Sequence, residues 1–72
     1  MKDYYYIMFG SLNYDEDPLF LSANYEISHS PDRIKVFSSL EDAVDYKHKL
    51  LAYETYQQSY MFDYYEINIE RF

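Results

Sequence analysis

One helical segment that follows Ser39 constrains the fold of this chain more than any other feature. Ser39 is a favourable N-cap residue, and Asp42 stands at the capping-box position three residues later. Apolar residues then recur with the helical period on one face, at Leu40, Ala43, Val44, Leu50 and Leu51. Tyrosines recur every seven residues along the flank of this face, at positions 46, 53 and 60. We expect the helix to run from Leu40 to about Tyr60.

The stretches on both sides of this helix have the composition and alternation of β-strands. We expect strands at 4–9, 19–27, 33–37 and 64–71, the first of them ending at Gly10. The segments 13–18 and 28–32 are rich in Asn, Asp, Ser and Pro, which predicts turns or loops. A chain of 72 residues is long enough for a single domain, 1–72. The sequence therefore predicts an α+β fold with the order β-β-β-α-β, in which one helix covers one face of a four-stranded, mainly antiparallel sheet.

Alternation along the strands predicts which residues lie on each face of the sheet. The face under the helix is expected to hold Tyr5, Ile7, Phe9, Ile34, Val36, Tyr65, Ile67 and Ile69. The opposite face is expected to carry Tyr4, Tyr6, Met8 and Tyr64 beside Glu66 and Glu70. An uncovered aromatic face on so small a domain predicts self-association, with a two-fold homodimer as the common arrangement, or direct contact with a partner. The residues proposed for this contact are Tyr4, Tyr6, Tyr64 and Glu66.

Charge and aromatic content restrict the partners. Thirteen acidic residues against six basic ones give a formal charge of −7, while 22% of the residues are aromatic. Acidic disordered tails are poor in aromatic residues, so the chain is expected to fold. Its negative field disfavours nucleic acid and anionic membranes as direct partners and favours a basic protein surface. The alternative is an acidic surface that serves solubility alone.

Other features predict an intracellular, cytoplasmic protein. The chain has no cysteine, so neither a disulfide nor a thiolate metal site is expected. The N-terminal apolar run is shorter than the core of a signal peptide, and no run approaches the roughly 18 apolar residues of a membrane span.

We find no pattern that predicts catalysis or a cofactor. His29 lies in an expected turn and His48 on the helix between lysines, where each is most simply a solvated residue. Asp15, Glu16 and Asp17 lack the spacing, the central glycine and the terminal glutamate of an EF-hand. A phosphate loop is not expected because Gly10 stands alone, and paired carboxylates have little room for a cleft. We therefore expect a binding protein with no catalytic residues, no cofactor and no metal.

The chain resembles the small acidic host-takeover proteins of large bacteriophages that infect Gram-positive bacteria. The shared features are its length, the Tyr-Tyr-Tyr start, the crowded acidic residues and tyrosines, and the lack of Cys and Trp. Within that class the chain is similar to inhibitors of the bacterial DNA sliding clamp, which mimic DNA in the channel of the clamp. The resemblance is one of overall character along the whole chain and involves no specific motif. It implies a DNA-mimicking inhibitor of DNA replication that acts in the host bacterial cytoplasm. Alternative targets are RNA polymerase, a nucleoid protein or a CRISPR nuclease, and a further alternative is an adaptor that docks through the aromatic face.

Two sets of residues bear on that target. The pentapeptide at 58–62 resembles the clamp-binding peptide, although a helix C-terminus with Met61 and Phe62 in the core explains it more simply. Carboxylates can substitute for the phosphates of a duplex, which carries one charge per roughly 1.7 Å of axis. The acidic residues of the chain form three groups, in the first loop, around the helix start and near the last strand. The group near the last strand is Asp63, Glu66 and Glu70. The residues predicted to contact a basic partner lie in the first loop and around the helix start: Asp15, Glu16, Asp17, Asp32, Glu41, Asp42 and Asp45.

Overall fold

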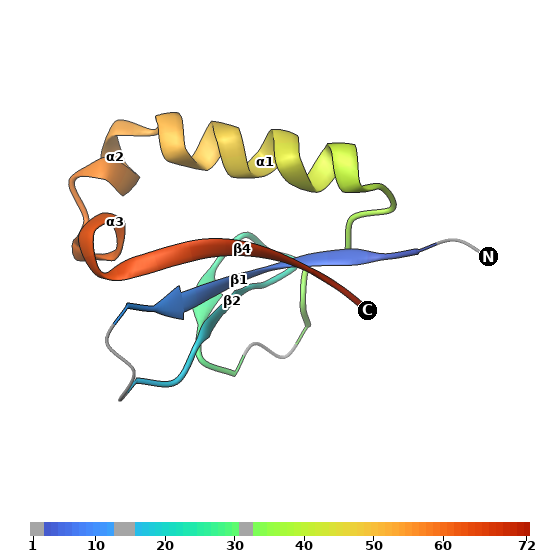
Figure 1. The fold of residues 1–72 in the computed structure, drawn as a ribbon, viewed down its shortest axis with the longest axis horizontal. Coiled ribbons are helices and arrows are strands. Elements are labelled where there is room, and N and C mark those ends of the chain that lie inside the picture. Colours follow the sequence, from blue (N-terminus) through green and yellow to red (C-terminus); the bar gives the residue numbers. More distant parts are fainter. Residues whose placement is uncertain (1–2, 13–15, 31–32) are drawn as a thin grey trace.

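The computed structural model describes residues 3–12, 16–30 and 33–72, and it has an α+β fold in two layers. The strands are β1 (Tyr5–Ser11), β2 (Leu19–Leu21), β3 (Ile27–Ser28) and β4 (Tyr65–Arg71). The helices are α1 (Leu40–Ala52), α2 (Glu54–Gln57) and α3 (Tyr60–Tyr64). The sheet is antiparallel with the spatial order β3-β2-β1-β4, and α1 lies over one of its faces (Figure 1). The predicted class, a four-stranded antiparallel sheet with a helix on one face, is confirmed.

The core lies between α1 and the central strands. Ile7 and Phe9 of β1 are fully buried, and they pack with Leu21, Ala43 and Ile67 in one cluster. This explains the strand pattern, because alternate residues of β1 and β4 point to the helix-covered face. Tyr5 and Ile69 are partly buried against the same cluster, as predicted. Two apolar predictions are wrong: Val36 is 45% exposed and Leu40 is 51% exposed, because both flank the turn that leads into α1.

The helix begins where the sequence predicts and ends earlier. The Oγ of Ser39 accepts a hydrogen bond from the backbone N–H of Asp42 at 3.1 Å, which confirms the predicted N-cap. The backbone leaves the helical conformation at Tyr53, so the expected single helix to about Tyr60 is replaced by α1, α2 and α3. A straight helix of that length would span about 30 Å, which is longer than a seven-residue strand of about 23 Å. The break lets the chain turn back and enter β4 antiparallel to β1 (Figure 1).

The expected strand from Leu19 to Ile27 is interrupted by a turn. The backbone N–H of Tyr25 donates to the carbonyl of Ser22 at 2.9 Å, and that of Ser22 donates to the carbonyl of Glu26 at 2.8 Å. The buried Ser22 side chain supports this turn, since its Oγ donates to the carbonyl of Glu26 at 3.0 Å. The chain therefore reverses, and it forms β2 and β3 as an antiparallel pair. Serine and asparagine are ordinary turn residues, and their local hydrogen bonds outweigh the apolar alternation here.

The expected strand at 33–37 is also wrong. Its segment forms two isolated bridges, between Ile34 and Ser22 and between Phe37 and Tyr5. The segment thus bonds to the end of β2 and then to the start of β1, too briefly with either to form a strand. It still buries Phe37 in the core. The four observed strands match the predicted number because the segment at 19–28 supplies two of them.

Candidate binding surfaces

The acidic residues predicted to bind a partner are exposed wherever the structure describes them. Glu41, Asp42 and Asp45 lie on the exposed side of α1, and Glu16 and Asp17 precede β2. Asp15 and Asp32 lie outside the described residues. The carboxylate of Glu16 accepts a hydrogen bond of 2.6 Å from the hydroxyl of Tyr65, which fixes its position at the start of β4.

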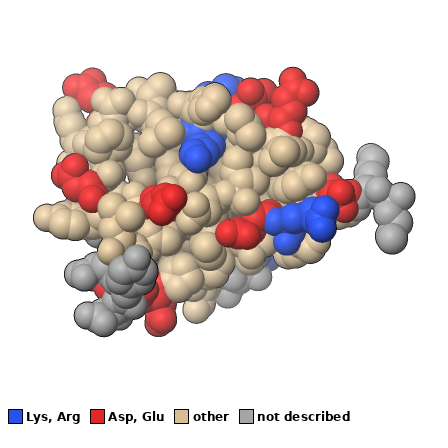
Figure 2. Space-filling view, in the orientation of Figure 1, with Lys and Arg blue, Asp and Glu red and all other residues tan. Residues whose placement is uncertain are grey.

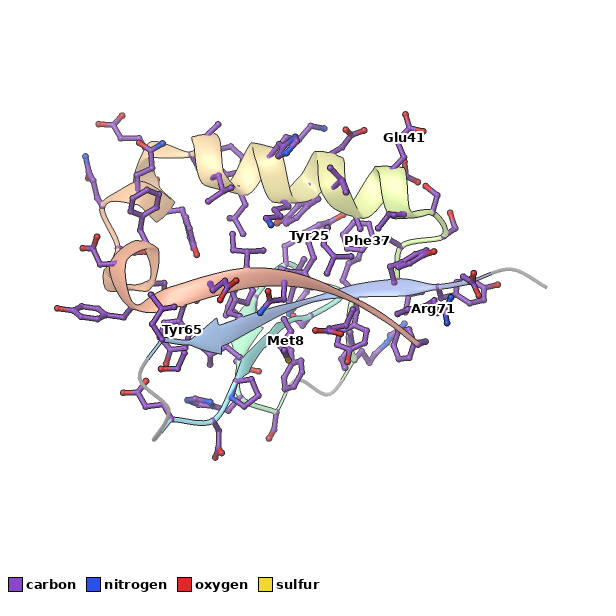
Figure 3. All side chains as sticks on the ribbon, in the orientation of Figure 1. Met8, Tyr25, Phe37, Glu41, Tyr65 and Arg71 are labelled. Carbon is purple, nitrogen blue, oxygen red and sulfur yellow. The ribbon has the colours of Figure 1, made fainter. Side chains whose placement is uncertain are left out.

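These acids form two separate groups at opposite ends of the molecule. Tyr65, to which Glu16 is bonded, lies at one end of the sheet, and Glu41 lies at the other end above the sheet (Figure 3). The longest dimension of the chain is 37 Å. Figure 2 shows acidic side chains distributed along this length with single basic groups between them. The structure therefore does not bring the predicted acids together into one patch.

Most of the acidic side chains that the structure describes form no ion pair with a described cation. Within the described residues, the ion pair joins Arg71 to Asp3, with 3.8 Å between the Arg71 Nη1 and the Asp3 carboxylate, and both side chains are exposed. Such a pair contributes little to stability in water. The acids on α1 thus have no cationic partner among the described side chains.

The sheet face opposite α1 carries an aromatic cluster, which we call the open face: Tyr4, Tyr6, Met8, Phe20 and Phe72, with Glu66, Asn68 and Glu70 beside them. The ring of Tyr6 lies 4.8 Å from that of Phe72 and 6.3 Å from that of Phe20. Phe72 is 64% exposed, and Met8 points to this side of the sheet (Figure 3). Tyr64, predicted to lie here, belongs instead to α3 and is exposed at its end. Sequence reasoning missed Phe20 and Phe72, although the alternation of each strand places them on this face.

A second aromatic group surrounds the turn at Tyr25. Tyr25 has a φ of 64°, which is uncommon for a bulky residue, and its ring stacks on Tyr46 at 5.6 Å. The ammonium of Lys35 lies over both the Tyr25 ring and the Phe37 ring, at 5.4 and 5.7 Å. Burial raises the pKa of Tyr46, and the nearby Tyr25 and Tyr53 raise it further. These contacts hold the turn against the end of the core.

A groove lies between α1 and β4. It has a volume of about 430 Å³ and is lined by Leu12, Lys47, Leu51, Tyr56, Phe62, Tyr65, Glu66, Ile67 and Asn68. Leu51 is partly buried and Phe62 is exposed, whereas Met61 is buried in the core. The pentapeptide at 58–62 therefore cannot offer both of its apolar residues to a partner. The simpler explanation placed both Met61 and Phe62 in the core, and it is correct for Met61 and wrong for Phe62.

Among the residues that the structure describes, the two histidines lie in different parts of the fold. His29 lies near the carbonyl of Pro18, with 3.3 Å between Nδ1 and the oxygen, and His48 is exposed on α1. Among these residues no group of three His, Cys, Asp or Glu side chains could hold a metal ion. The helices that the structure describes are all too short or too polar to cross a membrane.

No family model, curated protein or solved structure matches this chain.

Proposed function

We propose that this chain is a non-catalytic binding protein of the bacterial cytoplasm that inhibits a host DNA-binding protein by occupying its basic DNA-binding surface. The DNA sliding clamp is the first candidate target, with blocked DNA replication as the consequence. The observation that carries the proposal is the exposure of the acids on α1 and before β2, without ion-pair partners among the described residues. A carboxylate with no cation of its own keeps its attraction for the lysines and arginines of another protein.

The separation of the two acidic groups favours a concave partner. Glu16 and Asp17 lie at one end of a molecule 37 Å long, and Glu41 lies toward the other (Figure 3). A flat basic patch would meet one group at a time. A ring or a groove lined with basic residues would meet both, and such shapes are typical of proteins that surround a duplex.

The net charge of the chain is much smaller than that of a duplex of the same length. A duplex of the same length carries about 20 phosphate charges, whereas the chain has a net charge of −7. Exposed ion pairs contribute only about 0–1 kcal/mol each, so apolar contacts are needed for tight binding. The open face supplies them through Tyr6 and Phe72. This supports a second candidate function, an adaptor that docks mainly through the open face.

The test is displacement of labelled duplex DNA from purified sliding clamp, RNA polymerase, nucleoid protein and CRISPR nuclease, measured as salt is raised. We expect displacement from at least one of them, with an affinity that falls steeply with salt. A variant with Glu41→Gln and Asp45→Asn, combined with Glu16→Gln and Asp17→Asn, should bind more weakly and with a shallower salt dependence. Asp42 is left unchanged because it lies in the first turn of α1, next to the Ser39 cap, and its replacement could weaken the helix.

A matched control removes the charges of Glu26 and Glu54, which lie outside the predicted set, and is compared with Glu41→Gln and Asp45→Asn. An equal loss of affinity in the two double variants would show that net charge, rather than the position of the acids, determines binding. Failure to displace DNA from every protein of the panel would refute the inhibitor function. Unchanged affinity and salt dependence in the fourfold variant would refute DNA mimicry and favour the adaptor.

A further inference from the structure

One edge of the sheet is long and open. β4 is the last strand in the sheet order, it has seven residues, and in the described part of the chain its strand partner is β1. In Figure 1, β4 lies in front of β1 and β2, and no other drawn element lies in front of it. Natural proteins usually avoid a long open edge by using a short strand, by placing charges on it or by covering it, because an open edge can pair with a further strand.

The register shows which backbone groups face outward. The N–H and the carbonyl of Tyr5 both bond to Phe37, on the side of β1 away from β4. By contrast, the N–H of Leu12 donates to the carbonyl of Tyr64, and the N–H of Phe72 donates to the carbonyl of Tyr4. The backbone N–H and carbonyl groups of the even-numbered residues of β1 therefore point toward β4. Since Met8 is paired with Asn68, the even-numbered residues of β4 point their N–H and carbonyl groups at β1. Those of Ile67, Ile69 and Arg71 therefore point outward, and no described backbone group bonds to them.

The groove between α1 and β4 runs beside this edge. Its lining includes Leu51 of α1, Phe62 of α3 and Ile67 of β4, so it can receive an apolar side chain on the helix-covered side. Lys47, Glu66 and Asn68 also line it, and the Lys47 ammonium would repel a basic side chain placed beside it. An open edge next to a partly apolar groove is the arrangement by which sheets take up extended peptides.

The opposite side of β4 selects basic residues. Glu66 and Glu70 lie on the open face with Asn68 between them. Side chains of an added strand would lie opposite these acids at about 5 Å, where lysine or arginine is attracted. A second copy of this chain fits less well, because antiparallel pairing about Asn68 would place Glu66 of each copy opposite Glu70 of the other.

We propose that the edge of β4, with the groove under α1, binds an extended peptide of alternating basic and apolar residues as an antiparallel fifth strand. Apolar side chains lie under α1 near Ile67, and basic side chains lie beside Glu66 and Glu70. The backbone bonds to Ile67, Ile69 and Arg71 give affinity, and the two faces give specificity. This surface differs from the acids proposed to displace DNA, so either proposal can fail alone.

The probe is a blocked peptide as long as β4 that alternates lysine and valine, labelled for fluorescence anisotropy. In the antiparallel arrangement the valines lie opposite Ile67 and Ile69, and their N–H groups bond to β4. N-methylation of the valines should weaken binding about tenfold, and N-methylation of the lysines about twofold at most. Glu66→Gln with Glu70→Gln should weaken binding several-fold. Glu26→Gln with Glu54→Gln, which removes the same charge elsewhere, should leave it within about twofold.

Amide exchange gives a second readout on the unmodified chain. The N–H groups of Ile67 and Ile69 should exchange fast without peptide and slowly with it, whereas that of Asn68 should be slow throughout. Equal effects of the two N-methylated peptides, or of the two charge variants, would overturn the proposal. Slow exchange of Ile67 and Ile69 in a peptide-free dimer would assign the edge to a second copy and overturn it as well.

Discussion

Tyr46 lies against two other rings, and its hydroxyl links the stability of the fold to pH. Its ring is 5.6 Å from that of Tyr25 and 5.8 Å from that of Phe37. Burial, together with the nearby Tyr25 and Tyr53, raises its pKa above the ordinary value of 10.0. A tyrosine whose pKa is raised by folding binds its proton more tightly in the folded state. Its contribution to stability is therefore complete below about pH 10 and is lost as the pH rises through the folded-state pKa.

We expect the urea midpoint of the wild-type chain to fall between about pH 10 and pH 12, and to fall less in Tyr46→Phe, which has no proton to lose there. The exposed Tyr4→Phe should follow the wild type and controls for the loss of a hydroxyl. Tyr56 contributes in the same direction, since burial raises its pKa too, so Tyr46→Phe should remove only part of the fall. Identical alkaline profiles for Tyr46→Phe and the wild type would contradict this assignment.

The break after α1 decides which tyrosine enters the core. Tyr56 of α2 is 6% exposed and Tyr53, at the break, is 55% exposed. Tyr56→Ala should therefore destabilise the fold by about 3–5 kcal/mol, whereas Tyr53→Ala should change its stability by no more than about 0.5 kcal/mol. The check is the free energy of unfolding in urea, with Tyr56→Leu as a milder variant if Tyr56→Ala does not fold. Comparable losses at the two positions would refute the break at Tyr53.

The sequence predicts elements best where a local signal and the tertiary structure agree. Ser39 caps α1, and the alternation from Tyr65 to Ile69 matches a strand with one buried face, so both were predictable. The break at Tyr53 was not, because it has no proline or glycine and it places Tyr56 against Phe9 of β1, with 6.4 Å between the ring centroids. There the side-chain Nε2 of Gln57 donates to the carbonyl of Leu51 at 2.7 Å, which satisfies an end of α1 that a continued helix would have bonded.

The candidate surfaces were predictable only in part for the same reason. Exposure of Glu41 and Asp45 follows from their place on the helix wheel, away from the apolar stripe. The separation of these acids from Glu16 depends on the path of the whole chain, which alternation does not encode. The outward backbone groups of β4 likewise depend on its place at the end of the sheet order, and only the pairing of strands reveals this.

The net charge of the molecule opposes contact between copies, while the open face favours it. Two copies of charge −7 repel each other, and the aromatic rings of Tyr6 and Phe72 gain from burial. Salt separates these effects, because raising it from about 0.1 M to about 1 M shortens the Debye length from about 10 Å to about 3 Å and leaves apolar contact in place. Self-association should therefore strengthen with salt, whereas the proposed binding to a basic partner should weaken.

We accordingly predict, from sedimentation at micromolar concentration, a dimer whose fraction rises with salt. Tyr6→Ala with Phe72→Ala should make the chain a monomer at every salt concentration, since both rings leave the open face. Glu41→Gln with Asp45→Asn should dimerise more readily than the wild type at low salt, because less charge opposes the contact. A wild-type chain that stays monomeric at about 1 M salt would exclude the dimer. A dimer that dissociates as salt rises would show that ion pairs, rather than the open face, hold the two copies together.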